Sequence, residues 1–91
     1  MTYEEITEQT TETLTYLMNE ATSASGKHNA EMFCNAAWGA LVLWRDITHK
    51  MEKNNLKAKR KNFNLTETIN LQDAEFKKLI DRQLLKDMET R

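Results

Sequence analysis

The chain contains no proline and only two glycines, Gly26 and Gly39, in 91 residues. Proline and glycine are the residues that most often interrupt regular structure and form tight turns. An all-β fold of this length needs many such turns, so the composition argues against one. Helices need few interruptions, and we therefore expect an all-α fold.

Size and composition place the chain in a narrow class. Ninety-one residues form one domain, near the lower size limit for a self-sufficient core. The single cysteine, Cys34, excludes an intrachain disulfide, which fits a reducing compartment. The acidic N-terminus lacks the basic and apolar regions of a signal peptide. The longest apolar run, residues 36–44, is far shorter than the roughly 20 residues of a membrane span. We expect a cytoplasmic protein without a membrane segment.

Apolar residues spaced three and four apart predict three helices, over residues 1–24, 29–54 and 70–89. The first helix begins with Thr2 and Glu5, which have the spacing of a capping box. Gly26 is expected to end it as a left-handed cap. Residues 55–69 are predicted to be a basic and polar connector, and their alternating apolar positions also allow a short extended stretch.

The second predicted helix has the strongest apolar pattern. From Ala36 to Trp44 it is apolar on all sides, and a helix of that kind is normally buried on all sides. The first helix has only a narrow apolar face and the C-terminal segment is charged, so the two are not expected to cover it. We therefore expect each chain to form a helical hairpin with a C-terminal helix, and several copies to assemble as a homo-oligomer. Gly39 and the alanines around it would form a smooth strip for close helix packing. The residues expected at interfaces are Ala36, Gly39, Leu41, Leu43, Trp44, Phe76, Ile80 and Leu84.

Charge is unevenly distributed although the net charge is only −1. Residues 1–31 carry a net charge of −5, and residues 32–62 carry +5. This asymmetry favours antiparallel pairing within the chain or between copies, and it is equally compatible with a basic surface kept for a partner. The basic cluster from Lys50 to Lys61 would suit phosphate contacts on a continuous helix. Because the total charge is near neutral, the favoured interpretation is that the cluster pairs with the acidic first helix or simply solvates a helix end, and nucleic-acid binding is not expected.

The sequence carries no pattern typical of an enzyme active site. Cys34 lies six residues after His28, and no Cys/His spacing matches a zinc site, so we interpret Cys34 as a small buried apolar residue. Asp46 and His49 share one helix face, which is typical of a solvated polar surface. Glycine-rich phosphate loops are absent. We therefore expect a non-enzymatic protein with no catalytic residue, metal or cofactor.

One stretch of the second helix carries a family resemblance. Between Gly39 and Ile47 the chain has the pattern G-x-apolar-x-L-x-R-x-I, within a helical hairpin. It resembles the anti-CBASS sponge family, small phage proteins that sequester cyclic-nucleotide immune signals. The matching stretch covers at most about a quarter of the chain. Lys27 and His28 stand where we expect Arg-Trp in the family pattern, and the residues from Lys53 onward have no counterpart.

The resemblance implies a phage-encoded protein of the host cytoplasm that counters host defence. It would form symmetric oligomers and bind cyclic di- and trinucleotides without degrading them. For such a ligand, Lys27 and Arg45 are our candidate phosphate contacts, Arg45 because guanidinium groups pair bidentately with phosphate. Tyr16 or Trp38 would stack on a base, although core packing is the favoured interpretation of Trp38.

A second function class fits the same sequence. An inhibitor or regulator of a host enzyme, such as a nuclease or RNA polymerase, would bind through one face of an amphipathic helix. Its docking surface would be the apolar stripe of the third helix, Phe76, Leu79, Ile80, Leu84 and Met88. The expected partners are therefore a second copy of the chain, with either a cyclic oligonucleotide or a host protein.

Overall fold

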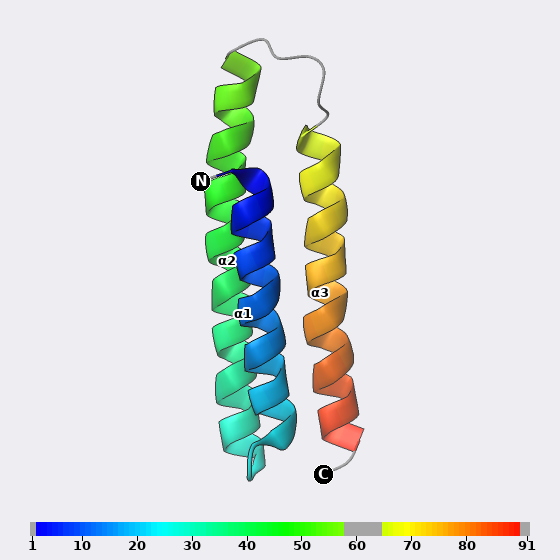
Figure 1. Cartoon of the computed structure of the whole chain (residues 1–91). Coiled ribbons are helices and arrows are strands. Elements are labelled where there is room, and N and C mark those ends of the chain that lie inside the picture. Colours follow the sequence, from blue (N-terminus) through cyan, green and yellow to red (C-terminus); the bar gives the residue numbers. More distant parts are fainter. Residues whose placement is uncertain (1, 58–64, 90–91) are drawn as a thin grey trace.

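The computed structural model describes the backbone of residues 2–57 and 65–89 and the side chains of residues 2–54 and 65–80. These residues form three α-helices and no strand: α1 (Tyr3–Ser23), α2 (Lys27–Lys57) and α3 (Leu65–Glu89). The predicted all-α fold is confirmed. α1 and α2 form an antiparallel hairpin, and α3 lies along it, running in the same direction as α1 (Figure 1). Assembly of several copies stays a prediction.

The helix boundaries differ from the predicted ones at both connections. α2 runs from Lys27 to Lys57, so it is longer at each end than the predicted 29–54. α3 begins at Leu65 rather than at Asn70, and the start of α3 therefore replaces the last part of the predicted connector. The alternation of apolar residues was misleading there, because Leu65 and Ile69 are also four residues apart. Both are buried, as one face of a helix requires. Residues 58–64 lie outside the described part of the chain.

α1 begins with the predicted capping box. The Glu5 backbone N–H donates to Thr2 Oγ1 at 3.1 Å, and the Thr2 N–H donates to Glu5 Oε1 at 3.2 Å. The bond from the Thr2 amide is the main reason that the pKa of Glu5 lies below its ordinary value. Gly26 has a positive φ of 90°, as predicted, but its carbonyl accepts from Ala30 N. Gly26 therefore caps the start of α2 rather than the end of α1, whose C-cap is Ala24 in an extended conformation.

The hydrophobic core lies where the three helices meet. Each helix contributes a stripe of residues three or four apart, as amphipathic helices do. The core residues are Ile6, Leu14, Met18 and Ala21 from α1, Cys34, Ala37, Leu41 and Trp44 from α2, and Leu65, Ile69, Phe76 and Ile80 from α3. One side of α2 is thus covered within a single chain.

Four residues that we predicted at an interface between copies belong to this core instead. Leu41 and Ile80 have no exposed surface, Trp44 is 1% exposed and Phe76 is 3% exposed. The prediction was wrong because α3 was judged too charged to cover α2, whereas its inner face is apolar. Leu84 lies outside the described side chains.

The predicted docking stripe of the third helix fails for the same reason. Phe76 and Ile80 already pack against the hairpin of their own chain, and Leu79 is half-buried beside them. A surface that holds the fold together is not free to bind a host protein. Met88, like Leu84, lies outside the described side chains.

Trp44 joins the three helices at the centre of the core. Its ring meets Phe76 of α3 edge-on at a centroid distance of 5.1 Å, and Tyr3 of α1 at 6.4 Å. Its indole N–H donates to Thr7 Oγ1 of α1 at 3.0 Å. A buried indole N–H requires such an acceptor. Thr7 therefore has a specific role among the many threonines of α1.

Replacing Thr7 with Val is expected to lower the free energy of unfolding by about 1–2 kcal/mol, because the Trp44 N–H loses its acceptor. Valine keeps the β-branched shape and a similar helix propensity. Thr11→Val is the matched control: its exposed hydroxyl donates only to the Thr7 carbonyl, so a change below about 0.5 kcal/mol is expected. Urea unfolding measures both, and equal losses in the two variants would contradict the role of Thr7.

Candidate functional site

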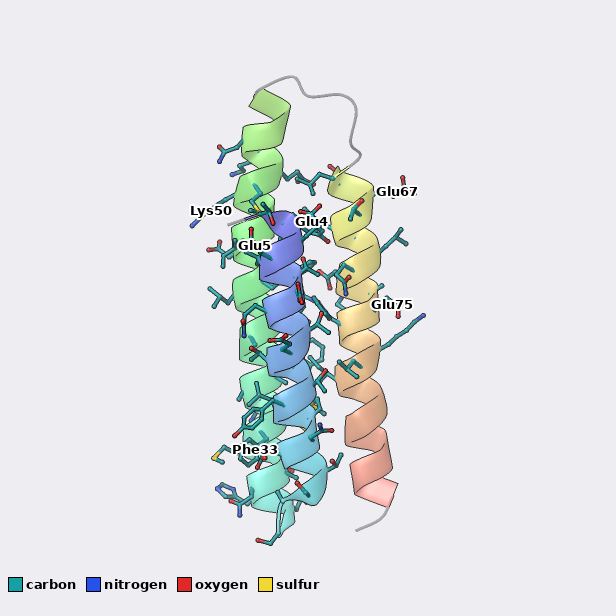
Figure 2. The ribbon with its side chains drawn as sticks, in the orientation of Figure 1. Glu4, Glu5, Phe33, Lys50, Glu67 and Glu75 are labelled. Carbon is teal, nitrogen blue, oxygen red and sulfur yellow. The ribbon has the colours of Figure 1, made fainter. Side chains whose placement is uncertain are left out.

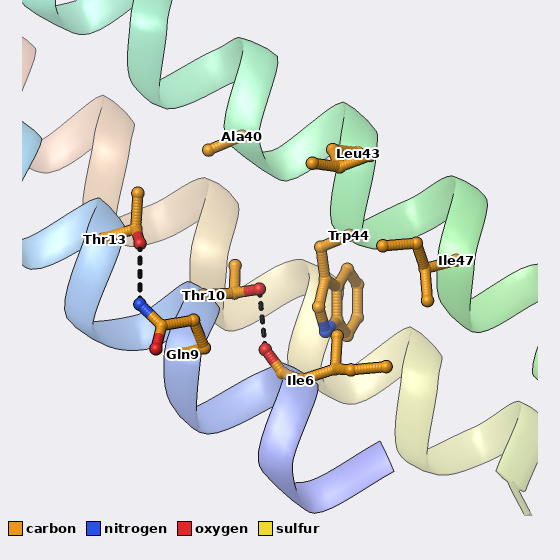
Figure 3. A pocket seen from close by; sticks show the side chains of 8 residues that line it. All are labelled: Ile6, Gln9, Thr10, Thr13, Ala40, Leu43, Trp44 and Ile47. Atoms are coloured by element: carbon orange, nitrogen blue, oxygen red, sulfur yellow. Dashed lines mark hydrogen bonds between the residues drawn. The ribbon is translucent and has the colours of Figure 1, made fainter. Parts of the chain in front are cut away.

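A shallow groove runs between α1 and α2, with the ribbon of α3 behind it (Figure 3). Its volume is about 190 Å³, and Trp44 lies at its inner side. None of its lining residues is charged. They are Ile6, Gln9, Thr10 and Thr13 from α1, and Ala40, Leu43, Trp44 and Ile47 from α2. The groove therefore offers an apolar surface on the side of the hairpin that α3 does not cover.

Apolar residues continue from the groove over the outer side of α2. Leu43 is 61% exposed and Met32 is 52% exposed. In chain order, Met32, Ala36, Gly39 and Leu43 are separated by four, three and four residues. This spacing places the four residues on one helix face. A Cβ added at Gly39 would meet nothing within 4 Å. The predicted close approach at Gly39 is thus not made by any described part of the same chain.

α1 adds one exposed aromatic residue to this surface. Tyr16 is 60% exposed and follows Gln9 by two helical turns, so both lie on the groove side of α1. We call the groove together with Tyr16, Met32, Ala36 and Gly39 the α1–α2 face. Of the residues predicted at interfaces, Ala36, Gly39 and Leu43 lie on this face and are exposed in the single chain.

The four residues predicted to hold a nucleotide are not brought together. Lys27 begins α2, and Arg45 lies about 27 Å further along the helix axis at 1.5 Å per residue. Trp38 precedes Arg45 by two turns, so it shares the side of α2 that faces α3, and it packs against the core. Tyr16 lies on the other helix, beside the groove. Within one chain these side chains form no common site, and a nucleotide ligand stays a prediction.

Arg45 is already held by an ion pair. Its Nε and Nη2 donate to the two carboxylate oxygens of Asp73 at 2.8 and 2.9 Å. The side chains are only 28% and 20% exposed. These hydrogen bonds are the main cause that lowers the pKa of Asp73 and raises that of Arg45. A phosphate would have to displace Asp73, so the geometry favours a role for Arg45 in joining α2 to α3.

The sequence contained an unused signal for this pair. Asp73 follows Ile69 by four residues and precedes Phe76 by three, so it interrupts the apolar stripe of α3. A carboxylate at an inward-facing position needs a partner. The predicted helix start at residue 70 would place Asp73 in the first turn, where an acidic residue needs no partner, and the observed start at Leu65 removes that explanation.

The cysteine, histidine and carboxylate side chains are spread over the described part of the chain rather than clustered. Cys34 is 4% exposed and packs in the core. Asp46 pairs with Lys50 at 3.2 Å, and His49 lies 3.8 Å from Glu52, all on α2. In residues 2–54 and 65–80, no three side chains of the metal-binding types gather at one place. No helix in the described part of the chain has the length and apolar character to cross a membrane.

The basic cluster is described only at its beginning. Lys50 and Lys53 are exposed, and the side chains from Asn55 to Lys61 lie outside the described set. Among the described side chains, no ion pair joins α1 to α2. The predicted pairing of the cluster with the acidic first helix is therefore not made by Lys50 and Lys53.

Comparisons of the chain with protein-family models, curated proteins and solved structures found no match.

Replacing Asp73 with Asn is expected to lower the free energy of unfolding by about 1–2 kcal/mol at neutral pH, because a half-buried guanidinium loses its charged partner. Asp46→Asn is the matched control. It removes an ion pair with Lys50 whose side chains are 63% and 74% exposed, and such pairs contribute less than about 1 kcal/mol. Thermal or urea unfolding compares the two variants, and equal effects would contradict the assigned role of Asp73.

The same pair predicts a pH dependence. The pKa of Asp73 in the folded chain lies below its ordinary value of 3.8. The stabilisation is therefore present above that value and is lost as the pH falls through the lower pKa of the folded state. The difference in stability between the unmodified chain and Asp73→Asn should shrink in acid. A difference that grows as the pH falls would contradict this explanation.

Proposed function

We propose that the protein is a non-enzymatic binding module that docks through the α1–α2 face onto another protein surface. The observation that carries the proposal is the exposure of Leu43 and Met32, at 61% and 52%, beside a groove without charged lining. Contiguous apolar patches on soluble domains mark binding surfaces more often than scattered single residues do. Grooves between helices accept the apolar side chains of another helix.

The size of the groove favours side chains over a small molecule. Its volume of about 190 Å³ is below the roughly 300 Å³ at which ligand pockets begin. The polar groups that line it are bonded within α1: the Thr10 hydroxyl donates to the Ile6 carbonyl at 2.8 Å, and the Gln9 amide donates to Thr13 Oγ1 at 3.4 Å (Figure 3). The lining includes no acid, base or thiol. These features support docking rather than catalysis.

Sequestering a cyclic nucleotide has weaker support from the geometry. Lys27 and Arg45 are about 27 Å apart along α2. The guanidinium of Arg45 is also already paired with the carboxylate of Asp73. A phage origin and a role against host defence depend on the sequence resemblance alone. A regulatory role through protein contacts fits the apolar face better. Its docking surface is then on α1 and α2, and not on the third helix as the sequence suggested.

A photo-crosslinking amino acid placed at position 43 tests this function in the cells that express the protein. The side chain of Leu43 lies on the α1–α2 face, so ultraviolet light should join the chain covalently to whatever protein docks there. Position 71 is the matched control, because Leu71 is 63% exposed on α3 and lies outside that face. We expect a crosslinked product from position 43 and none from position 71.

The product also identifies the partner, because mass spectrometry reads the sequence of the attached protein. No crosslinked protein from position 43, with the variant present at normal levels, would contradict the proposed function. Equal crosslinking from both positions would contradict the assignment of the face.

A further inference from the structure

The partner of the α1–α2 face is constrained by charge. α1 contains five glutamates and no lysine or arginine. At the same end of the hairpin, α2 carries the exposed Lys50 and Lys53. Glu5 and Lys50 both lie on the side of the molecule away from α3, whereas Glu4 lies on the side of α3 (Figure 2). One edge of the face is therefore acidic and the other is basic.

These charges are not paired across the hairpin. Lys50 bonds Asp46 of its own helix, with both side chains well exposed. Glu5 is used by the capping box. Exposed pairs of this kind contribute little and are easily exchanged. A partner must therefore present a basic edge to α1 and an acidic edge to α2, and a second copy of the chain presents both.

We propose that a second copy of this chain covers the α1–α2 face, with α1 of each copy lying on α2 of the other. This inference rests on the proposed function and names the partner of the same site. A two-fold axis parallel to the helices produces the arrangement. Neighbouring helices are then antiparallel, and the acidic start of α1 meets the basic end of α2, which is the usual order in an antiparallel four-helix bundle.

The arrangement also accounts for Tyr16 and Gly39. Thr13 of α1 and Ala40 of α2 line the same part of the groove, so Tyr16 lies level with Ala36 and Gly39. A two-fold axis parallel to the helices keeps these levels. The exposed ring of Tyr16 then lies on the small-residue strip of the other copy. No described atom of the same chain lies within 4 Å of a Cβ built at Gly39, and in the pair the missing side chain makes room for the ring.

The area of the face is sufficient for a stable pair. α1 has 21 residues, about 31 Å in length, and two helices side by side are about 20 Å wide, so the face covers roughly 600 Å². Two copies would bury about 1,200 Å², at the lower end of the range for stable, specific interfaces. The dissociation constant is therefore expected in the micromolar range.

Sedimentation equilibrium of the purified chain measures the pair directly. At about 100 µM, well above a micromolar dissociation constant, we expect twice the chain mass of 10.7 kDa. A single-chain mass at that concentration would overturn the proposal. It would leave the proposed function standing if position 43 still crosslinks to another protein in cells, so the two failures can be told apart.

Two matched variants locate the interface. Leu43→Glu is expected to raise the dissociation constant at least ~100-fold, because each copy would bury an unpaired carboxylate. Leu71→Glu makes the same change at an equally exposed leucine on α3, and its mass should stay that of a pair. Circular dichroism checks that both variants are helical. A pair that survives Leu43→Glu, or that Leu71→Glu dissociates, would overturn the proposal.

A charge exchange tests which helices meet. One variant carries Glu5→Lys in α1 and the other carries Lys50→Glu in α2, because these two positions lie on the side of the molecule away from α3 (Figure 2). Each alone should pair weakly, because like charges face each other in both halves of its interface. An equimolar mixture should form mixed pairs, since opposite charges then meet in both halves. A mixture that pairs no better than its components would overturn the proposed arrangement.

Discussion

The packing of Trp44 is the interaction on which the rest of the structure depends. Its indole contacts Phe76 of α3 and Tyr3 of α1, and its N–H is bonded to Thr7. A large aromatic residue supplies more buried apolar area than any other side chain, and a small domain has few such residues. Because Trp44 draws α1 and α3 onto one side of α2, the opposite side of α2 is left with Met32 and Leu43 exposed.

The ion pair of Arg45 and Asp73 favours one position of α3 along the hairpin. The apolar stripe of α3 would allow the helix to slide along the hairpin, since its buried residues are similar in kind. A carboxylate inside that stripe is stable only where it meets the guanidinium, so the pair favours one register of α3. The core and the pair together fix the three helices, and they leave Tyr16, Met32 and Leu43 of the α1–α2 face exposed. That face is consequently available for binding.

Features set by local chemistry could be predicted from the sequence, and features set by tertiary packing could not. The capping box of Thr2 and Glu5 and the absence of strands in the described residues follow from short-range preferences. The start of α3 was missed because residues 65–69 fit both an alternating and a helical pattern. The partner of Arg45 was missed because a phosphate and a carboxylate are equally good ligands for guanidinium. The exposure of Leu43 depends on where α1 and α3 lie, which the apolar pattern of α2 alone does not determine.

The central claim is that all three helices share one core around Trp44, and urea unfolding followed by two probes tests it most directly. The fluorescence of the two tryptophans, both on α2 and both in contact with the core, reports on packing. Far-ultraviolet circular dichroism reports on the helices of the whole chain. A single core predicts that both signals change together, with the same midpoint and slope. Loss of a third of the helical signal at lower urea, before the fluorescence changes, would show that α3 unfolds by itself and would contradict the claim.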